Sequence, residues 1–134
     1  MTVFIDSNIP MYVAGKPHPH RGPSLRLLER VRSGEVEGVT STEVLQEILY
    51  RYSALGKLDL AVSVYDLFAR ICSKVLPVTL ADTDRARALL PTIEGVSVRD
   101  AIHASVMLGN GIRTIATFDE GFDRIHGLRR MKLD

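Results

Sequence analysis

The segment TVFIDSN at residues 2–8 decides how the rest of the chain is interpreted. Residues 2–5 form a short run of β-branched and aromatic side chains that ends at a carboxylate, and this run predicts a buried strand. Ser7 or Asn8 can cap a short helix directly afterwards, and Pro10 is tolerated in its first turn. The segment is therefore expected to be a strand followed by a helix, with Asp6 at the junction.

The same alternation continues to the other end of the chain. A loop is expected at Gly15–Pro23, where prolines and glycines gather, and the helix after it ends near Gly34. Further strands are expected at 36–39, 75–78, 112–117 and 129–133, the second at a sheet edge because it contains Pro77. Further helices are expected at Ser41–Leu55, Leu58–Ile71, Thr83–Leu90 and Ser97–Leu108, with a short turn or helix at 118–125. Short strands between helices predict an α/β domain with a mostly parallel sheet.

Length and composition limit the possible classes of protein. The chain has 134 residues, which fits a single domain spanning 1–134. Hydrophobic residues make up 46% and charged residues 25%, so disorder is excluded as the main state. The 17 basic and 16 acidic residues give a net charge of +1, which argues against a histone-like nucleic-acid binder. Nucleic acid is not excluded, because charges can be separated on the surface.

Cysteine content and the N-terminal segment bear on the cellular compartment in which the protein is expected. The single Cys72 excludes an internal disulfide scaffold and a zinc site made of cysteines. The first residues lack the basic region of a signal peptide, and no apolar run reaches the ~18 residues of a membrane span. A cytoplasmic protein without membrane contact is therefore expected.

Acidic residues at the ends of the predicted elements carry the functional signal. Asp6 and Asp119 each follow a strand, and ligand sites of open parallel sheets form at the carboxyl ends of strands. If the two strands are neighbours, the two carboxylates meet. On the helix from Ser41, Glu43 is explained by a capping box that begins at Thr40. Glu47 has no such explanation beyond an ion pair with Arg51 at i+4.

Asp100 and His103 lie one turn apart on a helix rich in small residues. Asp100 can stabilise the N-terminus of this helix, where the helix dipole favours a negative charge, and Ser97 can be its N-cap. The small residues also allow close packing, which would press the Asp100 carboxylate into the domain. His103 is interpreted as a packing or hydrogen-bonding residue without a catalytic role.

Four clustered carboxylates would repel one another unless they are protonated or bind a cation. Oxygen ligands favour Mg²⁺ or Mn²⁺ over zinc. Such a cluster suits hydrolysis of phosphodiesters, in which metal ions activate water and stabilise the leaving oxygen.

At this point the sequence resembles the PIN-domain ribonucleases, and among them the VapC-like toxins of toxin–antitoxin pairs. Phe4-Ile5-Asp6-Ser7-Asn8 resembles the D-x-N motif that opens the family pattern. The segment 40–47 resembles the family segment whose last residue is a functional Glu, here Glu47. Residues 100–104, DAIHA, resemble the D-A-x-x-A helix start, and residues 117–123, TFDEGFD, resemble the closing T-x-D-x-x-F segment. The four motifs occur in the family's order over nearly the whole chain.

The resemblance implies a three-layer α/β/α fold whose five-stranded parallel sheet has the order 3-2-1-4-5. It also implies a Mg²⁺- or Mn²⁺-dependent endoribonuclease that hydrolyses RNA by in-line attack of a metal-activated water. The implied catalytic and metal-binding acids are Asp6, Glu47, Asp100 and Asp119. The implied supporting residues are Asn8, Thr117 and Asp123, the last as a possible acid behind the metal ligands.

Partners also follow from the resemblance. A VapC-like toxin is expected to pair with a cognate antitoxin protein, which the apolar faces of Ser41–Leu55 and Leu58–Ile71 could bind, and to form a homodimer. Basic residues around the acidic pocket would bind RNA phosphates rather than read bases. The candidates for these contacts are Arg21, Arg26, Arg30, Arg51, Arg99 and Arg113.

Three other functions stay open. A housekeeping PIN nuclease in RNA processing would have the same residues. A catalytically inactive RNA-binding module would have the same fold, although all four acids are present here. A receiver-like phosphoacceptor domain also has acids at strand ends, but it needs a lysine near the end of a late strand. No lysine occurs between Lys74 and Lys132.

Overall fold

A computed structural model describes residues 1–134 and contains one sheet of five parallel strands in the order β3-β2-β1-β4-β5. The strands are β1 (Thr2–Ile5), β2 (Glu37–Ser41), β3 (Lys74–Leu76), β4 (Thr114–Ala116) and β5 (Arg129–Arg130). This is the predicted order, and β3 lies at a sheet edge as Pro77 indicated. The central strand β1 pairs with β2 and with β4, and Ile5 lies opposite Ala116.

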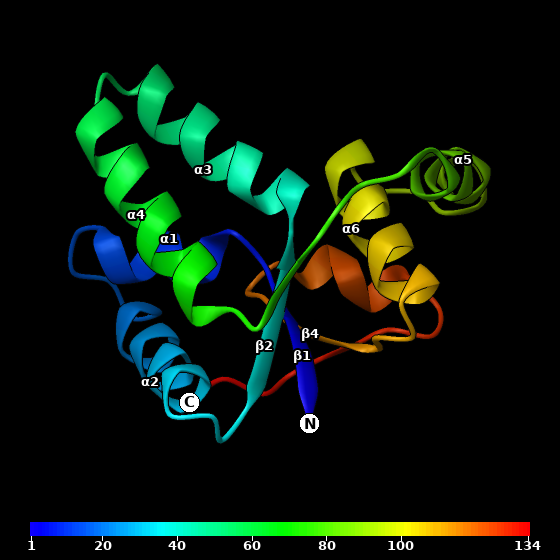
Figure 1. Cartoon of the computed structure of the whole chain (residues 1–134). Helices are drawn as coiled ribbons and strands as arrows, with labels where there is room; N and C mark the ends of the chain where they lie inside the picture. Colours follow the sequence, from blue (N-terminus) through cyan, green and yellow to red (C-terminus); the bar gives the residue numbers. More distant parts are fainter.

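Six α-helices cover the sheet in two groups, α1 to α4 on one side and α5 with α6 on the other, as Figure 1 shows. The helices are α1 (Asn8–Ala14), α2 (Arg21–Arg32), α3 (Thr42–Ala54), α4 (Leu58–Ile71), α5 (Leu80–Leu89) and α6 (Val98–Gly109). Two short 3₁₀ helices, η1 (Leu90–Thr92) and η2 (Glu120–Arg124), complete the chain. The arrangement confirms the expected α/β/α layers. None of the helices combines the length and apolar character needed to cross a bilayer.

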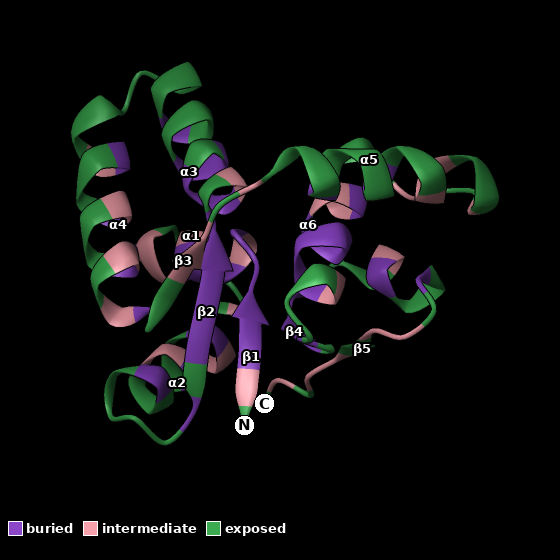
Figure 2. Cartoon of the chain, turned by 45° about the vertical axis from the view of Figure 1, so that its right-hand side comes forward, coloured by how far each residue is buried: buried purple, intermediate pink, exposed green.

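The hydrophobic core lies along the central strands. Val3, Phe4 and Ile5 of β1 have no exposed surface, and the buried residues of Figure 2 concentrate on β1, β2 and the inner faces of the helices. Gly38 lets α2 approach β2, because a Cβ at this position would lie 2.7 Å from Ile5 Cδ1 and from Val31 Cγ1. The core therefore fixes the central strands, whose carboxyl ends position the acids described below.

Several boundaries differ from the predicted ones by a few residues. The expected loop at 15–23 is shorter, since α2 begins at Arg21 and contains Gly22 and Pro23 in its first turn, where proline is tolerated. Helix α5 begins at Leu80 rather than Thr83, because Thr79 and Asp82 form a capping box that the sequence interpretation missed. Strands β4 and β5 are shorter than expected, and β2 extends two residues further, to Ser41.

The capping box expected at Thr40 and Glu43 is wrong. Thr40 still belongs to β2, and its hydroxyl donates to the carbonyl of Ile5 on the neighbouring strand. The N-cap of α3 is Ser41, whose hydroxyl accepts from the backbone N–H of Val44 at 3.3 Å. The strand continues two residues beyond its predicted end at Val39, and the cap of α3 therefore lies at Ser41 rather than Thr40.

Candidate active site

The four predicted acids come from four different elements and converge at the carboxyl ends of β1 and β4. Asp6 follows β1, Glu47 lies on the second turn of α3, Asp100 lies in the first turn of α6, and Asp119 is the N-cap of η2. The backbone N–H of Asp6 donates to the carbonyl of Ala116, so β1 and β4 remain in register up to the acids. The adjacency of these two strands, on which the sequence argument depended, is confirmed.

Asp6 is 5% exposed and is held by a set of short hydrogen bonds. The hydroxyl of Thr117 donates to its Oδ2 at 2.7 Å, and the backbone N–H of Ser7 donates to its Oδ1 at 2.7 Å. The amide of Asn8 donates to Thr117 Oγ1 at 3.0 Å and to Asp6 Oδ2 at 3.5 Å. Burial raises the pKa of Asp6, an effect that the charge of His103 and the Thr117 hydrogen bond oppose. Asn8 and Thr117 therefore orient the carboxylate of Asp6.

Glu47 is bound to His103, which has no exposed surface. His103 Nε2 donates to Glu47 Oε1 at 2.6 Å and lies 3.7 Å from Asp6 Oδ1, while the Ser7 hydroxyl donates to Glu47 Oε2 at 2.8 Å. Burial raises the pKa of Glu47, but the hydrogen bond and charge of His103 outweigh it, and the net pKa is lowered. For His103, burial lowers the pKa, and the bond to Glu47 together with the charge of Asp6 reverses the direction. The short bond to His103 therefore favours the ionised form of Glu47, while the buried Nδ1 of His103 has no hydrogen-bond partner.

Asp100 and Asp119 face each other over Gly121. A Cβ on Gly121 would lie 3.1 Å from Asp119 Oδ1 and 3.6 Å from Asp100 Oδ2, so a side chain there would crowd both carboxylates. Burial raises the pKa of Asp100 to about 7, and the hydrogen bond with Asp119 and the charges of Asp119 and Asp6 act in the same direction. Near neutral pH Asp100 therefore keeps much of its proton, and its full ionisation beside Asp119 is unfavourable.

The acids border a cavity of about 740 Å³ that is open to solvent on one side. All four acids line it, together with the polar residues Ser7, Asn8, Gln46, Ser97, Arg51 and Arg99 and the side chains of Met11 and Tyr50. A polar, acid-lined cavity of this size suits a charged ligand bound through a cation better than an apolar one.

The donor set fits a hard divalent cation. Asp6, Glu47 and His103 each present a possible ligand atom, and the three atoms lie within 4.8 Å of one another. Because His103 Nε2 donates to Glu47, the carboxylate oxygens rather than the imidazole are available to bind a cation. The buried Oδ1 of Asn8 has no hydrogen-bond partner, so it can accept from a water molecule bound to a cation. Asp100, whose pKa is raised, gains a counter-charge when a cation enters. Carboxylate-rich sites of this kind favour Mg²⁺ and Mn²⁺.

Some predicted residues lie elsewhere. Asp123 is exposed, and both of its carboxylate oxygens accept from Arg130, at 2.8 and 2.9 Å, so it contacts none of the four acids. Of the six arginines proposed for RNA contact, only Arg51 and Arg99 line the acidic cavity, and Arg99 Nη1 lies 3.3 Å from Glu47. The remaining four are bound to other parts of the chain, namely Arg21, Arg26, Arg30 and Arg113.

Sequence reasoning missed two residues of the site. Ser7 was expected as a helix cap, but its side chain makes no capping bond and donates to Glu47 instead. His103 was expected to pack or to form a hydrogen bond without a catalytic role, and the structure places that hydrogen bond on a predicted catalytic acid. The i+3 spacing from Asp100 was the only available signal, because one helical turn places both side chains on the same face.

Comparison with known proteins agrees with this arrangement. A family model described as PIN domain matches residues 3–128, which is nearly the whole chain. The chain belongs to the PIN-domain family. Ribonuclease VapC13 of Mycobacterium tuberculosis is 40% identical over 129 residues, covering 96% of this chain and 98% of that protein. Ribonuclease VapC23 of the same species is 34% identical over 117 residues, covering 87% and 92%. These relatives place the chain among the VapC ribonucleases of the PIN family, which excludes the receiver-like alternative.

Solved structures share the fold. VapBC2 from Rickettsia felis, bound to a DNA fragment from its promoter, contains a chain that superposes with a TM-score of 0.79 at 22% identity, and each chain is covered completely. VapC20 of Mycobacterium tuberculosis, described as a toxin that cleaves the sarcin–ricin loop, superposes with a TM-score of 0.74 at 21% identity, covering 90% and 92%. The PIN fold of this chain, with its strand order, is therefore found in solved VapC structures.

Proposed function

We propose that this chain is a divalent-metal-dependent endoribonuclease that acts as the toxin of a VapBC-type pair. The observation that carries the proposal is the convergence of Asp6, Glu47, Asp100 and Asp119 on one solvent-open cavity in a chain 40% identical to a VapC ribonuclease. In this proposal the four acids hold Mg²⁺ or Mn²⁺. When bound, such a cation lowers the pKa of a water molecule and offsets the negative charge of a phosphodiester.

The residues around the acids have separate tasks. Thr117 fixes the rotamer of Asp6, and its Oγ1 also accepts from the backbone N–H of Asp119 at 3.0 Å, so one hydroxyl links two of the acids. His103 holds Glu47 from the buried side and leaves its other oxygen to Ser7 and Arg99. Arg99 is about half exposed at the cavity rim, where its guanidinium can bind a phosphate of the RNA backbone.

Exposed apolar residues are the evidence for a surface that binds an antitoxin. Large hydrophobic side chains stay exposed on α3 and α4, namely Leu49, Tyr50, Leu55, Leu58, Val62 and Leu67. Side chains of this kind are buried when a protein partner covers them. The expected antitoxin surface is therefore this helix pair. The homodimer expected from the family resemblance stays a prediction, and a cytoplasmic location belongs to the same proposal.

RNA cleavage tests the enzyme. Wild type, Asp6→Asn and Asp100→Asn are incubated with RNA in Mg²⁺, in Mn²⁺ and in chelator, with Asp66→Asn as a control that removes an exposed acid of α4. We expect cleavage by wild type and by the control only when metal is present, and a loss of at least a hundredfold in both site variants. Unchanged cleavage by the two site variants would refute the assignment of the acids.

The neighbouring DNA tests the toxin role. A short adjacent reading frame for a DNA-binding protein that copurifies with this chain and suppresses its cleavage is expected. A chain that cleaves RNA but has no such neighbour would instead be a housekeeping nuclease.

A further inference from the structure

Four aromatic rings form a cluster that the proposed catalysis does not use. His20 stacks on Phe118 with ring centroids 3.8 Å apart and planes 9° from parallel. Tyr12 meets both of these rings edge-on, at 5.2 and 5.4 Å, and His18 lies 4.6 Å from Tyr12. The backbone N–H of His20 donates to His18 Nδ1 at 3.0 Å, which fixes the His18 ring in place. We call Tyr12, His18, His20 and Phe118 the ring cluster.

The ring cluster adjoins the acidic cavity. Phe118 lies between Thr117, which donates to Asp6, and Asp119, which lines the cavity. Tyr12 follows Asn8 by one turn of α1, a rise of about 5.4–6 Å. The loop that carries the two histidines therefore folds back onto the ends of β4 and α1, beside the predicted metal ligands.

The rings are accessible and lie beside positive charge. His18 is exposed, and the other three rings are only partly buried. Phe118 and Thr117 also line a second cavity of about 490 Å³, which we call the basic cavity after Arg129, Arg130 and Lys132. Its lining also includes the apolar Leu128, Met131 and Leu133 and the acid Asp123, which pairs with Arg130. The two cavities are neighbours, because Thr117 lines the second one and its hydroxyl donates to Asp6 of the first, and Phe118 joins the second cavity to the ring cluster.

We propose that the ring cluster stacks an unpaired base of the substrate RNA next to the bond that is cleaved, and that the basic cavity binds the phosphates that follow. The proposal rests on the proposed ribonuclease activity. Tyrosine, histidine and phenylalanine rings are the side chains that stack splayed bases of single-stranded RNA. Three of the four rings carry polar atoms, and Arg129 and Lys132 of the adjoining cavity form no ion pair, which favours a polyanion over an apolar protein segment.

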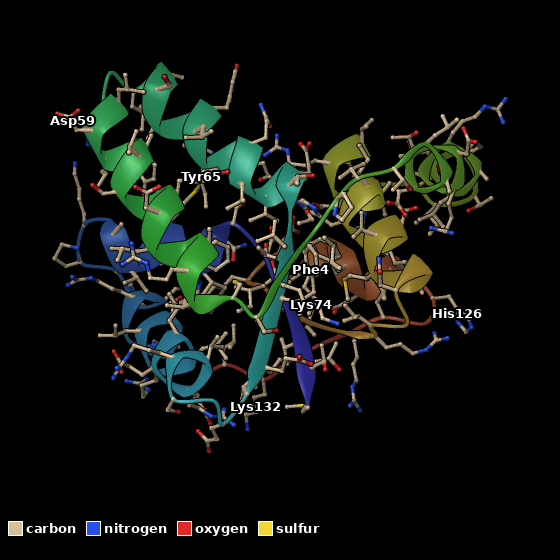
Figure 3. The ribbon with its side chains drawn as sticks, in the orientation of Figure 1. Phe4, Asp59, Tyr65, Lys74, His126 and Lys132 are labelled. Carbon is tan, nitrogen blue, oxygen red and sulfur yellow. The ribbon has the colours of Figure 1, made fainter.

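Steady-state cleavage kinetics test the proposal. The substrates are a short single-stranded oligoribonucleotide and a series in which one position at a time is abasic. The variants are His18→Ala, which alters an exposed ring, and Tyr12→Leu. Tyr65→Leu is the matched control, since Tyr65 is a partly buried tyrosine on α4 (Figure 3). Urea unfolding of each protein verifies that it is folded.

Both ring variants should raise KM for the intact oligomer about five- to a hundredfold with kcat nearly unchanged. The effect should disappear with one abasic substrate, because the stacked base is absent there. The control should behave as wild type. If wild type cleaves RNA and the ring variants leave KM unchanged, the base platform is refuted while the ribonuclease proposal stands.

Two other outcomes also overturn the platform. A rise in KM that is equal for every abasic substrate would show that the rings do not recognise a base. Loss of antitoxin binding with unchanged KM would assign the rings to the protein partner. If wild type cleaves no RNA under any metal condition, the proposed function itself fails, and the platform fails with it.

Discussion

Replacing Asp100 by asparagine should stabilise the metal-free protein. The ordinary pKa of this carboxyl is 3.8, and burial together with Asp119 and Asp6 raises its pKa to about 7. Each tenfold change in proton affinity equals about 1.4 kcal/mol, so the unscreened penalty above pH 7 is at most about 4 kcal/mol. Because Asp100 is partly exposed, water and salt screen the repulsion, and we expect about 1–2 kcal/mol to be recovered.

The pH dependence has a definite sign. Between about pH 4 and pH 7, Asp100 is ionised in the unfolded chain but protonated in the folded one, so the folded state holds the extra proton. Stability attributable to this residue is therefore lost as the pH rises through that window, and the penalty is complete above pH 7. Below pH 4 both states are protonated and the penalty is absent. Asp100→Asn removes the titration, so the two proteins should diverge in stability as the pH rises.

Thermal unfolding in chelator measures this difference. At pH 8 the variant should melt about 4–8 °C above wild type, and at pH 4 the two Tm values should nearly coincide. Asp66→Asn removes an exposed acid and should leave Tm within about 2 °C of wild type. Adding Mn²⁺ should raise the Tm of wild type more than that of Asp100→Asn. A variant that is less stable than wild type at pH 8 in chelator would refute the repulsion on which the metal argument depends.

The remaining predictions concern the supporting residues. Glu47→Gln should lower RNA cleavage at least tenfold, whereas Glu43→Gln, on the same helix but outside the cavity, should leave it unchanged in the same assay. Thr117→Val removes the hydroxyl that links two acids and should lower cleavage about 10–100-fold, with recovery in Thr117→Ser. Gly38→Ala places a methyl group 2.7 Å from two core side chains, and urea unfolding should show a loss of about 1–3 kcal/mol.

The sequence predicted the elements well where one physical signal acted alone. The apolar run of β1 has no competing interpretation, and its three core residues are fully buried. Predictions failed where two signals competed for one residue. Thr40 satisfies a capping pattern and a strand pattern equally, and the strand continues through it because its hydroxyl binds β1. The strand order came from the family resemblance, since periodicity alone does not say which strands are neighbours.

The acids of the candidate site could be predicted from the sequence, but not all of the side chains that form hydrogen bonds with them could. A carboxylate at the end of a strand is visible in the sequence, because the carboxyl edge of a parallel sheet is a known place for ligands. His103 could not be recognised in the same way, since its contact with Glu47 joins residues 56 positions apart. Asp123 occurs in a family motif but pairs with Arg130 on the surface, a contact that the motif does not predict.

The arrangement of the acids links stability to activity. Asp6 and Glu47 are buried, and their carboxylates accept hydrogen bonds from Thr117, Ser7 and His103. The pKa of Glu47 is lowered on balance, whereas burial keeps the pKa of Asp6 raised. Asp100 faces Asp119 and forms no ion pair, and the charge of His103 lowers its pKa by less than burial, Asp119 and Asp6 raise it, so its ionisation is costly in the metal-free protein. A protein that neutralised Asp100 internally would be more stable and would bind metal less tightly. A cation bound as proposed would offset the charge of Asp100, so tight metal binding and high stability of the metal-free protein are expected to oppose each other at this residue.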